Sequence, residues 1–177
     1  MKTLKQHINE ALKIGKNLSE LSSYFCQPKD NEELEQIIKD RISKEGPECD
    51  LNNIDVSLIE DMSYLFARFS FNGDISKWDT SKVKNMEFMF YKSKFTGDIS
   101  KWNTSNVENM NNMFSHSKFN GDISRWDVSK VNDMTGMFAY SGFNQDISNW
   151  KIRKDCDTSF MFNVCDIKEE FKPKLPK

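Results

Sequence analysis

The chain has 177 residues, and its 25 Lys and Arg against 27 Asp and Glu give a formal net charge of −2 at pH 7. This near balance excludes a strongly basic nucleic-acid-binding protein. Aromatic residues make up 12% of the chain, which excludes disorder as its overall state. No run of 18 apolar residues occurs in the sequence, so no membrane-spanning helix is predicted.

Residues 1–48 carry no repeat and predict a helical appendage. A stripe of apolar residues predicts a first helix over about residues 3–14. Asp30 and Glu33 form a capping box before a second helix that ends at Gly46 and Pro47. We expect the second helix to cover the open edge of the first repeat. The first helix either extends that cap or docks the chain onto another structure.

A repeat of 24 residues dominates residues 49–167. The tryptophans are Trp78, Trp102, Trp126 and Trp150. The recurring Asp, Ile and Ser slots begin with Asp74, Ile75 and Ser76. Methionine recurs with the same period at Met62, Met86, Met110 and Met134, and phenylalanine recurs at Phe66, Phe90, Phe114, Phe138 and Phe162. Such a period indicates stacked structural units, with atypical units at the two ends.

Each unit is predicted to contain a short strand and a short helical arm. The alternation around Ile75 favours a strand with Ile75 pointing inward. Val83, Met86, Met89 and Phe90 then form one apolar stripe of an α- or 3₁₀-helical arm. The predicted fold class is therefore an α+β repeat solenoid. It is a leucine-rich-repeat-like array of about five coils with a parallel strand ladder, capped by N-terminal helices. Residues 168–177 are predicted to be a frayed tail.

The repeated tryptophans and methionines have two interpretations each. The tryptophans favour a layer of the core over a carbohydrate-stacking track. The Met–Phe pairs favour core packing, because flexible Met fills gaps beside rings, over a copper site.

The column of Asp74, Asp98, Asp122 and Asp146 also has two explanations, because adjacent like charges are destabilising. The carboxylates either accept hydrogen bonds from the turn backbone or Ser hydroxyls, which lowers their pKa, or bind Ca²⁺. The hydrogen-bond explanation is favoured.

No pattern of an enzyme or a metal centre is recognisable. Cys26, Cys49, Cys156 and Cys165 lack zinc-site spacing, and they are expected to be free thiols, with a Cys156–Cys165 disulfide as the alternative. His7 and His116 are the only histidines, and no catalytic triad or phosphate-binding loop is present. We therefore expect no enzymatic activity, no cofactor and no resident metal.

The units FNGDISKWDTSKVKNMEFMF, FTGDISKWNTSNVENMNNMF and FNGDISRWDVSKVNDMTGMF resemble the bacterial BspA-type leucine-rich repeats, the domain of unknown function 285 family. The resemblance covers about residues 50–167. It implies a leucine-rich-repeat solenoid whose members are mostly surface or secreted proteins, with adhesion as the usual suggestion. This chain shows no signal peptide or lipobox. We therefore expect it in the cytoplasm of the producing cell or incorporated in a particle.

The sequence predicts a non-enzymatic binding module that offers a protein or glycan partner an adhesion-type surface. The reason is that apolar slots barely change between units while other slots vary freely. The candidate binding residues are the outward strand slots Asp74, Ser76, Asp98, Ser100, Asp122, Ser124, Asp146 and Ser148, the flanking cations Lys77, Lys101 and Arg125, and the aromatic anchors Tyr91, His116 and Tyr140.

The alternative is a structural or accessory protein of a phage or mobile element. It would dock through residues 3–14, because the opening segment weakly resembles segments of tailed-phage proteins. In either case we expect a monomer without nucleic-acid binding or membrane insertion.

Overall fold

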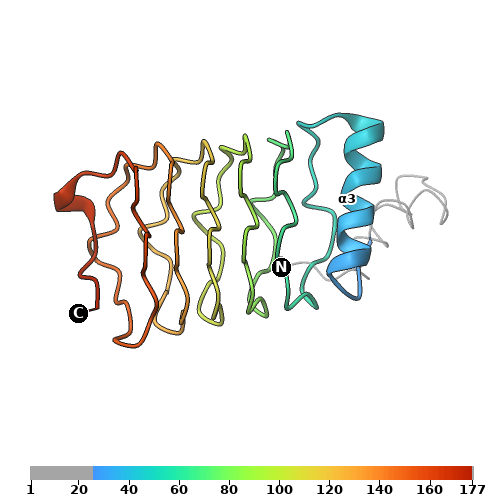
Figure 1. Cartoon of the computed structure of the whole chain (residues 1–177). Coiled ribbons are helices and arrows are strands. Elements are labelled where there is room, and N and C mark those ends of the chain that lie inside the picture. Colours follow the sequence, from blue (N-terminus) through green and yellow to red (C-terminus); the bar gives the residue numbers. More distant parts are fainter. Residues whose placement is uncertain (1–25, 177) are drawn as a thin grey trace.

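A computed structural model describes residues 26–176. The chain winds into a row of stacked coils, with the helix α3 (Asn31–Glu45) at one end and the short 3₁₀ helix η1 (Glu169–Phe171) at the other (Figure 1). The predicted helix over residues 3–14 and His7 lie outside the described residues. Within residues 26–176 no helix is long and apolar enough to cross a membrane.

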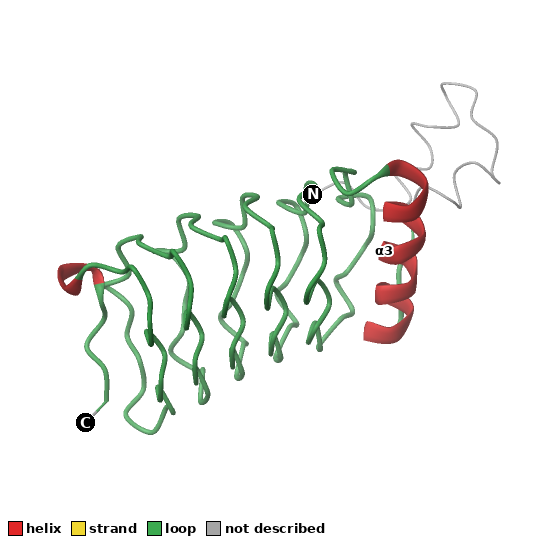
Figure 2. Cartoon of the chain, turned by 45° about the horizontal axis from the view of Figure 1, so that its top comes forward, coloured by secondary structure: helices red, strands yellow, loops and turns green. Residues whose placement is uncertain are grey.

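The predicted parallel strand ladder is wrong. Between residues 26 and 176 the chain forms no β-strand, and Figure 2 shows the coils as loops and turns. Neighbouring coils are joined by isolated parallel bridges, among them Asn85 with Asn109 and Asn109 with Asp133. The predicted helical arm over residues 83–90 is also wrong, since Asn85 forms a bridge within an irregular segment and residues 87–90 form a turn. The structure therefore does not support the leucine-rich-repeat solenoid.

Turns replace both predicted elements. The segment around Ile75 turns at once, with the Trp78 N–H donating to the Ile75 carbonyl at 3.2 Å, and left-handed residues shape the arm that follows. Two slots in each coil have positive φ, as at Phe88 (52°) and Lys92 (53°). A strand needs negative φ throughout, so these residues turn the chain instead. Turn hydrogen bonds follow, for example from Met89 N–H to the Met86 carbonyl at 3.2 Å. The intervening N–H groups donate to the next coil, as Phe88 does to the Asn111 carbonyl at 2.9 Å.

Short polar side chains fix further turns at three positions of each repeat. In every case an Asp or Asn Oδ1 accepts the backbone N–H two residues ahead, at 2.7–3.1 Å. The three series are Asp55, Asp79, Asn103 and Asp127; Asp50, Asp74, Asp98, Asp122 and Asp146; and Asp61, Asn85, Asn109, Asp133 and Asp157. The positions of these Asp and Asn residues in the sequence therefore determine where the chain turns.

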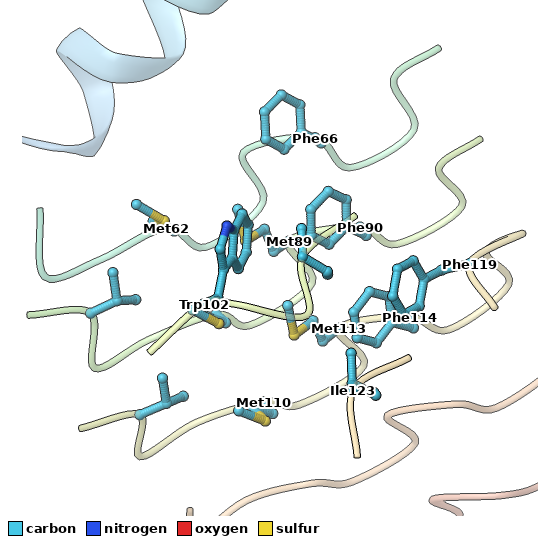
Figure 3. Packing of buried hydrophobic residues seen from close by; sticks show 14 of the residues in the cluster. Met62, Phe66, Met89, Phe90, Trp102, Met110, Met113, Phe114, Phe119 and Ile123 are labelled. Atoms are coloured by element: carbon cyan, nitrogen blue, oxygen red, sulfur yellow. The ribbon is translucent and has the colours of Figure 1, made fainter. Parts of the chain in front are cut away.

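The apolar slots fill one continuous core along the stack. Met86, Met110 and Phe114 are completely buried, which confirms the predicted inward stripe although its backbone is not helical. Equivalent rings stack from coil to coil, such as Phe90 on Phe114 with centroids 5.6 Å apart (Figure 3). Methionines such as Met89 and Met113 pack among these rings (Figure 3). Ring stacking between equal slots keeps the coils in register.

The tryptophans belong to the core and also connect the coils. Trp102 and Trp126 are each 4% exposed, so the carbohydrate-track alternative is wrong. The indole N–H of Trp102 donates to the Ile75 carbonyl at 3.1 Å, and Trp126 donates to Ile99 at 3.1 Å. Each Trp therefore satisfies a carbonyl of the preceding coil while burying its ring.

Both ends of the stack are covered in part. Asp30 caps the start of α3, where its side chain accepts the Glu33 N–H at 2.9 Å, and the helix buries Leu34 and Ile38 against the core. The predicted cap helix is thus present. At the other end the tail is packed and not frayed: the Ile147 N–H donates to the Phe171 carbonyl at 3.1 Å, and Pro173 is buried.

Candidate functional site

The predicted polar face consists of turn residues and not of outward strand slots. The Ser76, Ser100, Ser124 and Ser148 N–H groups donate to Asp74, Asp98, Asp122 and Asp146, at 2.9–3.0 Å. These hydrogen bonds hold the pKa of each carboxyl below its ordinary value, the backbone donor being the main cause. The hydrogen-bond explanation of the Asp column is therefore confirmed.

The rest of the polar face lies open to solvent. Lys77, Lys101 and Arg125 are exposed, as predicted for flanking cations. A depression of ≈ 350 Å³ is lined by polar residues only, namely Asp122, Ser124, Gln145, Asp146, Ser148 and Asn149. One oxygen of each carboxylate already accepts the N–H that closes a turn. The main role of the Asp residues on this face is therefore structural.

Two of the three freely varying slots form left-handed rows along the stack, and the third is the slot of Tyr91, Ser115 and Ala139. The first row is Tyr64, Phe88, Asn112, Gly136 and Phe160, and the second row is Arg68, Lys92, His116, Tyr140 and Val164. All have φ between 50° and 61°. Left-handed backbone is strained for residues other than Gly, and such strain gathers at functional positions. Tyr64, Tyr140, Phe160 and Val164 are also at least half exposed.

The structure brings the three predicted aromatic anchors together. Tyr91 meets His116 edge to face with ring centroids 5.9 Å apart, and His116 stacks on Tyr140 at 4.7 Å. Phe88 contacts the other side of Tyr91 at 5.2 Å. Asn163 donates its side-chain amide to the Tyr140 hydroxyl at 3.2 Å, which holds the last ring in place.

A pocket of ≈ 290 Å³ opens between the two left-handed rows; we call it the aromatic pocket. Its ring-bearing residues are Phe88, Tyr91, His116, Tyr140 and Phe160, and its other lining residues are Asn112, Ser115, Thr135, Gly136, Ala139 and Asn163. It shares no lining residue with the depression at Asp122. The anchors and the predicted polar residues therefore belong to two different sites.

Small residues create the aromatic pocket. The slot that Tyr91 fills in one coil is taken by Ser115 and Ala139 in the next two, and both are buried. Gly136 has no side chain in the row that holds Phe88 and Phe160, and a Cβ there would lie 2.7 Å from Asn112 Oδ1. The pocket thus lies where two successive slots of the first row, Asn112 and Gly136, carry no ring, between Phe88 and Phe160.

Sequence analysis identified these varying slots but missed the pocket's far wall. Phe160 and Asn163 lie in the degraded last unit, where the repeat gives little guidance. A useful signal was the change from Tyr91 to Ser115 and Ala139 in one slot. It marks a loss of volume at a position where the fold tolerates a ring.

Groups suited to metal binding or nucleophilic chemistry are few in the described chain. Within residues 26–176 no three His, Cys, Asp or Glu side chains gather to hold a metal ion. All four cysteines are free, Cys156 and Cys165 included. Burial raises the pKa of the Cys156 thiol to about 11, and it also raises the pKa of Cys26 and Cys49. These three thiols stay protonated at neutral pH, which makes them poor nucleophiles.

One family model matches the chain. It is described as "Mycoplasma protein of unknown function, DUF285", and it matches residues 33–138 and again residues 88–172. No curated protein and no solved structure shows significant similarity to the sequence. The two matches overlap and together span the repeats, most of α3 and half of the tail. The chain therefore belongs to the DUF285 family.

Proposed function

We propose that this protein is a non-enzymatic binding module and that the aromatic pocket is its recognition site. The observation that carries the proposal is the composition of the pocket. None of its eleven lining residues is Asp, Glu, Lys or Arg, although these make up 29% of the chain. Depletion of charge and enrichment of aromatic rings distinguish the centre of a recognition surface from ordinary surface.

The pocket suits an uncharged, ring-sized group of a protein or glycan partner. Its volume of ≈ 290 Å³ lies at the small end of ligand sites. Ring faces at Tyr140 and Phe160 offer stacking surface, and the side chains of Asn112, Thr135 and Asn163 offer hydrogen bonds. A charged ligand would gain little binding energy here, because no Asp, Glu, Lys or Arg lines the pocket.

The rings are held in place before a ligand arrives. The His116 ring lies perpendicular to Tyr91 and stacks on Tyr140, and the Tyr140 hydroxyl accepts a hydrogen bond from Asn163. Their backbone positions are fixed by hydrogen bonds to the next coil, such as His116 N–H to the Ala139 carbonyl at 2.8 Å. Rigid side chains lose little conformational entropy on binding, which favours affinity.

The test is a binding screen of labelled protein on an array of neutral and charged glycans and on a displayed peptide library. We expect ligands with uncharged rings to be enriched. The double variant His116→Ala, Tyr140→Ala should weaken the selected ligands at least ten-fold, while Lys77→Ala should leave them within two-fold. Selection of purely ionic ligands, or binding that survives the double variant, would contradict the proposal.

A further inference from the structure

The last coil carries a row of backbone donors that no described residue satisfies. In the preceding coils, four alternate N–H groups per coil donate to carbonyls of the next coil at 2.7–3.0 Å. One such set is Met134, Gly136, Phe138 and Tyr140, which donate to Asp157, Ser159, Met161 and Asn163. The equivalent donors of the last coil are Thr158, Phe160, Phe162 and Val164. Among residues 26–176 none of these four N–H groups has an acceptor.

The tail leaves this part of the end uncovered. Residues 165–173 return over the other part of the last coil, where Phe171 accepts from Ile147 and Lys168 donates its N–H to Asn144. Beside the donor row a depression of ≈ 410 Å³ remains between Lys154–Ser159 and Pro176. Phe160 and Val164 are 73% and 68% exposed. Phe162 stacks on Phe138, and Lys172 Nζ lies 5.8 Å from the Phe162 ring centroid.

We propose that this end of the stack is a second binding site, which takes up an extended segment of a partner polypeptide as an added half-coil. The row offers donors and no acceptors, so its complement is a line of carbonyl oxygens spaced at alternate residues. A polypeptide backbone supplies that line, as in strand addition to an open sheet edge. Apolar side chains at alternate positions would then cover Phe160, Phe162 and Val164.

A second copy of this chain does not fit the row. Two copies related by a two-fold axis would place donors against donors. Head-to-tail stacking would need the first coil, whose matching carbonyls belong to Asp61, Ser63, Leu65 and Ala67. α3 occupies that end, with Asn31 Nδ2 donating to the Ser63 carbonyl at 3.0 Å and with Leu34 and Ile38 buried. A second copy is therefore not the proposed occupant.

The probe is a capped 12-residue peptide with the sequence of residues 131–142 of this chain. Its carbonyls at positions 133, 135, 137 and 139 accept this kind of donor row within the stack. In the free protein we expect the amide hydrogens of Phe160, Phe162 and Val164 to exchange at least 100-fold faster than those of Phe114 and Phe138. Saturating peptide should slow their exchange at least ten-fold, as read by NMR.

Two variants separate this site from the aromatic pocket. Thr158→Pro removes one donor, and Val164→Lys places a charge beside the row in a slot where Lys92 already has the same left-handed backbone. Each should weaken the peptide at least five-fold, while Leu58→Lys, an exposed control, should not. Phe160 belongs to both sites, but neither variant replaces a residue that lines the aromatic pocket, so its ligands should still bind. Failure of the wild-type pocket to bind any ligand would instead count against the proposed function.

Three results would overturn the proposal. The amides of the row could be protected in the free monomer. The peptide could fail to bind at millimolar concentration, or bind without slowing exchange in the row. Sedimentation could show a dimer that Val164→Lys dissociates, which would make a second copy the occupant.

Discussion

Individual polar residues define the turns of this fold, and their charge state matters less than their acceptor oxygen. Asp98 and Asn103 cap turns in the same coil with Oδ1 at 2.9 and 3.1 Å from the N–H two residues ahead. The Asp carboxylate is a strong hydrogen-bond acceptor at neutral pH and a weaker one when it is protonated. Asn supplies the same acceptor at every pH. Turns capped by Asp should therefore weaken in acid, whereas turns capped by Asn should not.

The double variant Asp98→Asn, Asp122→Asn tests this role. The folded-state pKa of both carboxyls lies below the ordinary value of about 3.9. Their contribution to stability is therefore present above pH 4 and is lost as the pH falls through the folded pKa. We expect wild-type and variant urea midpoints to agree near pH 7, and the variant to lose less stability towards pH 2. An equal loss in both proteins would assign the acid sensitivity to other groups.

Trp126 offers a second test at the level of one residue. Trp126→Phe removes one of the two hydrogen bonds to the Ile99 carbonyl, which still accepts the Trp102 N–H at 3.2 Å. The expected cost of the lost hydrogen bond is about 0.5–1.5 kcal/mol of unfolding free energy, to which the loss from the smaller ring is added. Chemical denaturation measures it, with Arg125→Ala as the exposed neighbour that should change stability by less than about 0.5 kcal/mol. If Trp126→Phe lowers the unfolding free energy no more than Arg125→Ala does, the indole hydrogen bond does not help to hold the coils together.

At the scale of elements, helix α3 was predictable and the coil backbone was not. Asp30 and Glu33 give a capping signal, and Leu34 and Ile38 give a helical stripe, so local rules sufficed. The coils follow a different rule, because left-handed backbone at Phe88 and His116 is disfavoured for their residue types. Stacking of equivalent rings and hydrogen bonds between coils outweigh that local preference. The alternation around Ile75 therefore indicated its burial but not its backbone conformation.

The cap of α3 gives a prediction for this scale. Asp30→Ala removes the acceptor of the Glu33 N–H, which should lower stability by about 1 kcal/mol. The loss should be largest for amide hydrogens of α3 and the first coil, and hydrogen exchange resolves it. Asp40→Ala, in the same helix, is the matched control and should leave these rates within two-fold. Uniform destabilisation of all coils would show that α3 is not a separate cap.

For the whole molecule, the repeat predicted the buried residues well and the functional surface poorly. The slots of Met, Phe and Trp recur with period 24, and their burial follows from that regularity. The aromatic pocket arises where the period is broken, at Ser115, Ala139 and Gly136. A pattern defined by repetition carries no direct information about the volume of such a gap.

The continuity of the core predicts strong effects from its centre. Met110→Asp buries a charge among Met113, Phe114 and the neighbouring coils, which should cost more than about 4 kcal/mol. Far-ultraviolet circular dichroism and the melting temperature measure the loss. Lys92→Glu, an exposed control, should cost less than about 1 kcal/mol. A melting temperature of Met110→Asp within a few degrees of wild type would contradict the assignment of the core.

The most direct test of the account compares two variants on the same selected ligand. Ala139→Tyr places in the aromatic pocket the ring that Tyr91 already carries in the equivalent slot, so the coil should fold and the pocket should be filled. The quadruple variant Ser100→Ala, Lys101→Ala, Asp122→Asn, Arg125→Ala alters the polar face, keeps the turn acceptor at residue 122 and leaves the pocket unchanged. By calorimetry we expect Ala139→Tyr to abolish binding and the quadruple variant to bind within two-fold of wild type, both with melting temperatures near wild type. Binding that survives Ala139→Tyr but is lost in the quadruple variant would place recognition on the polar face and contradict the account.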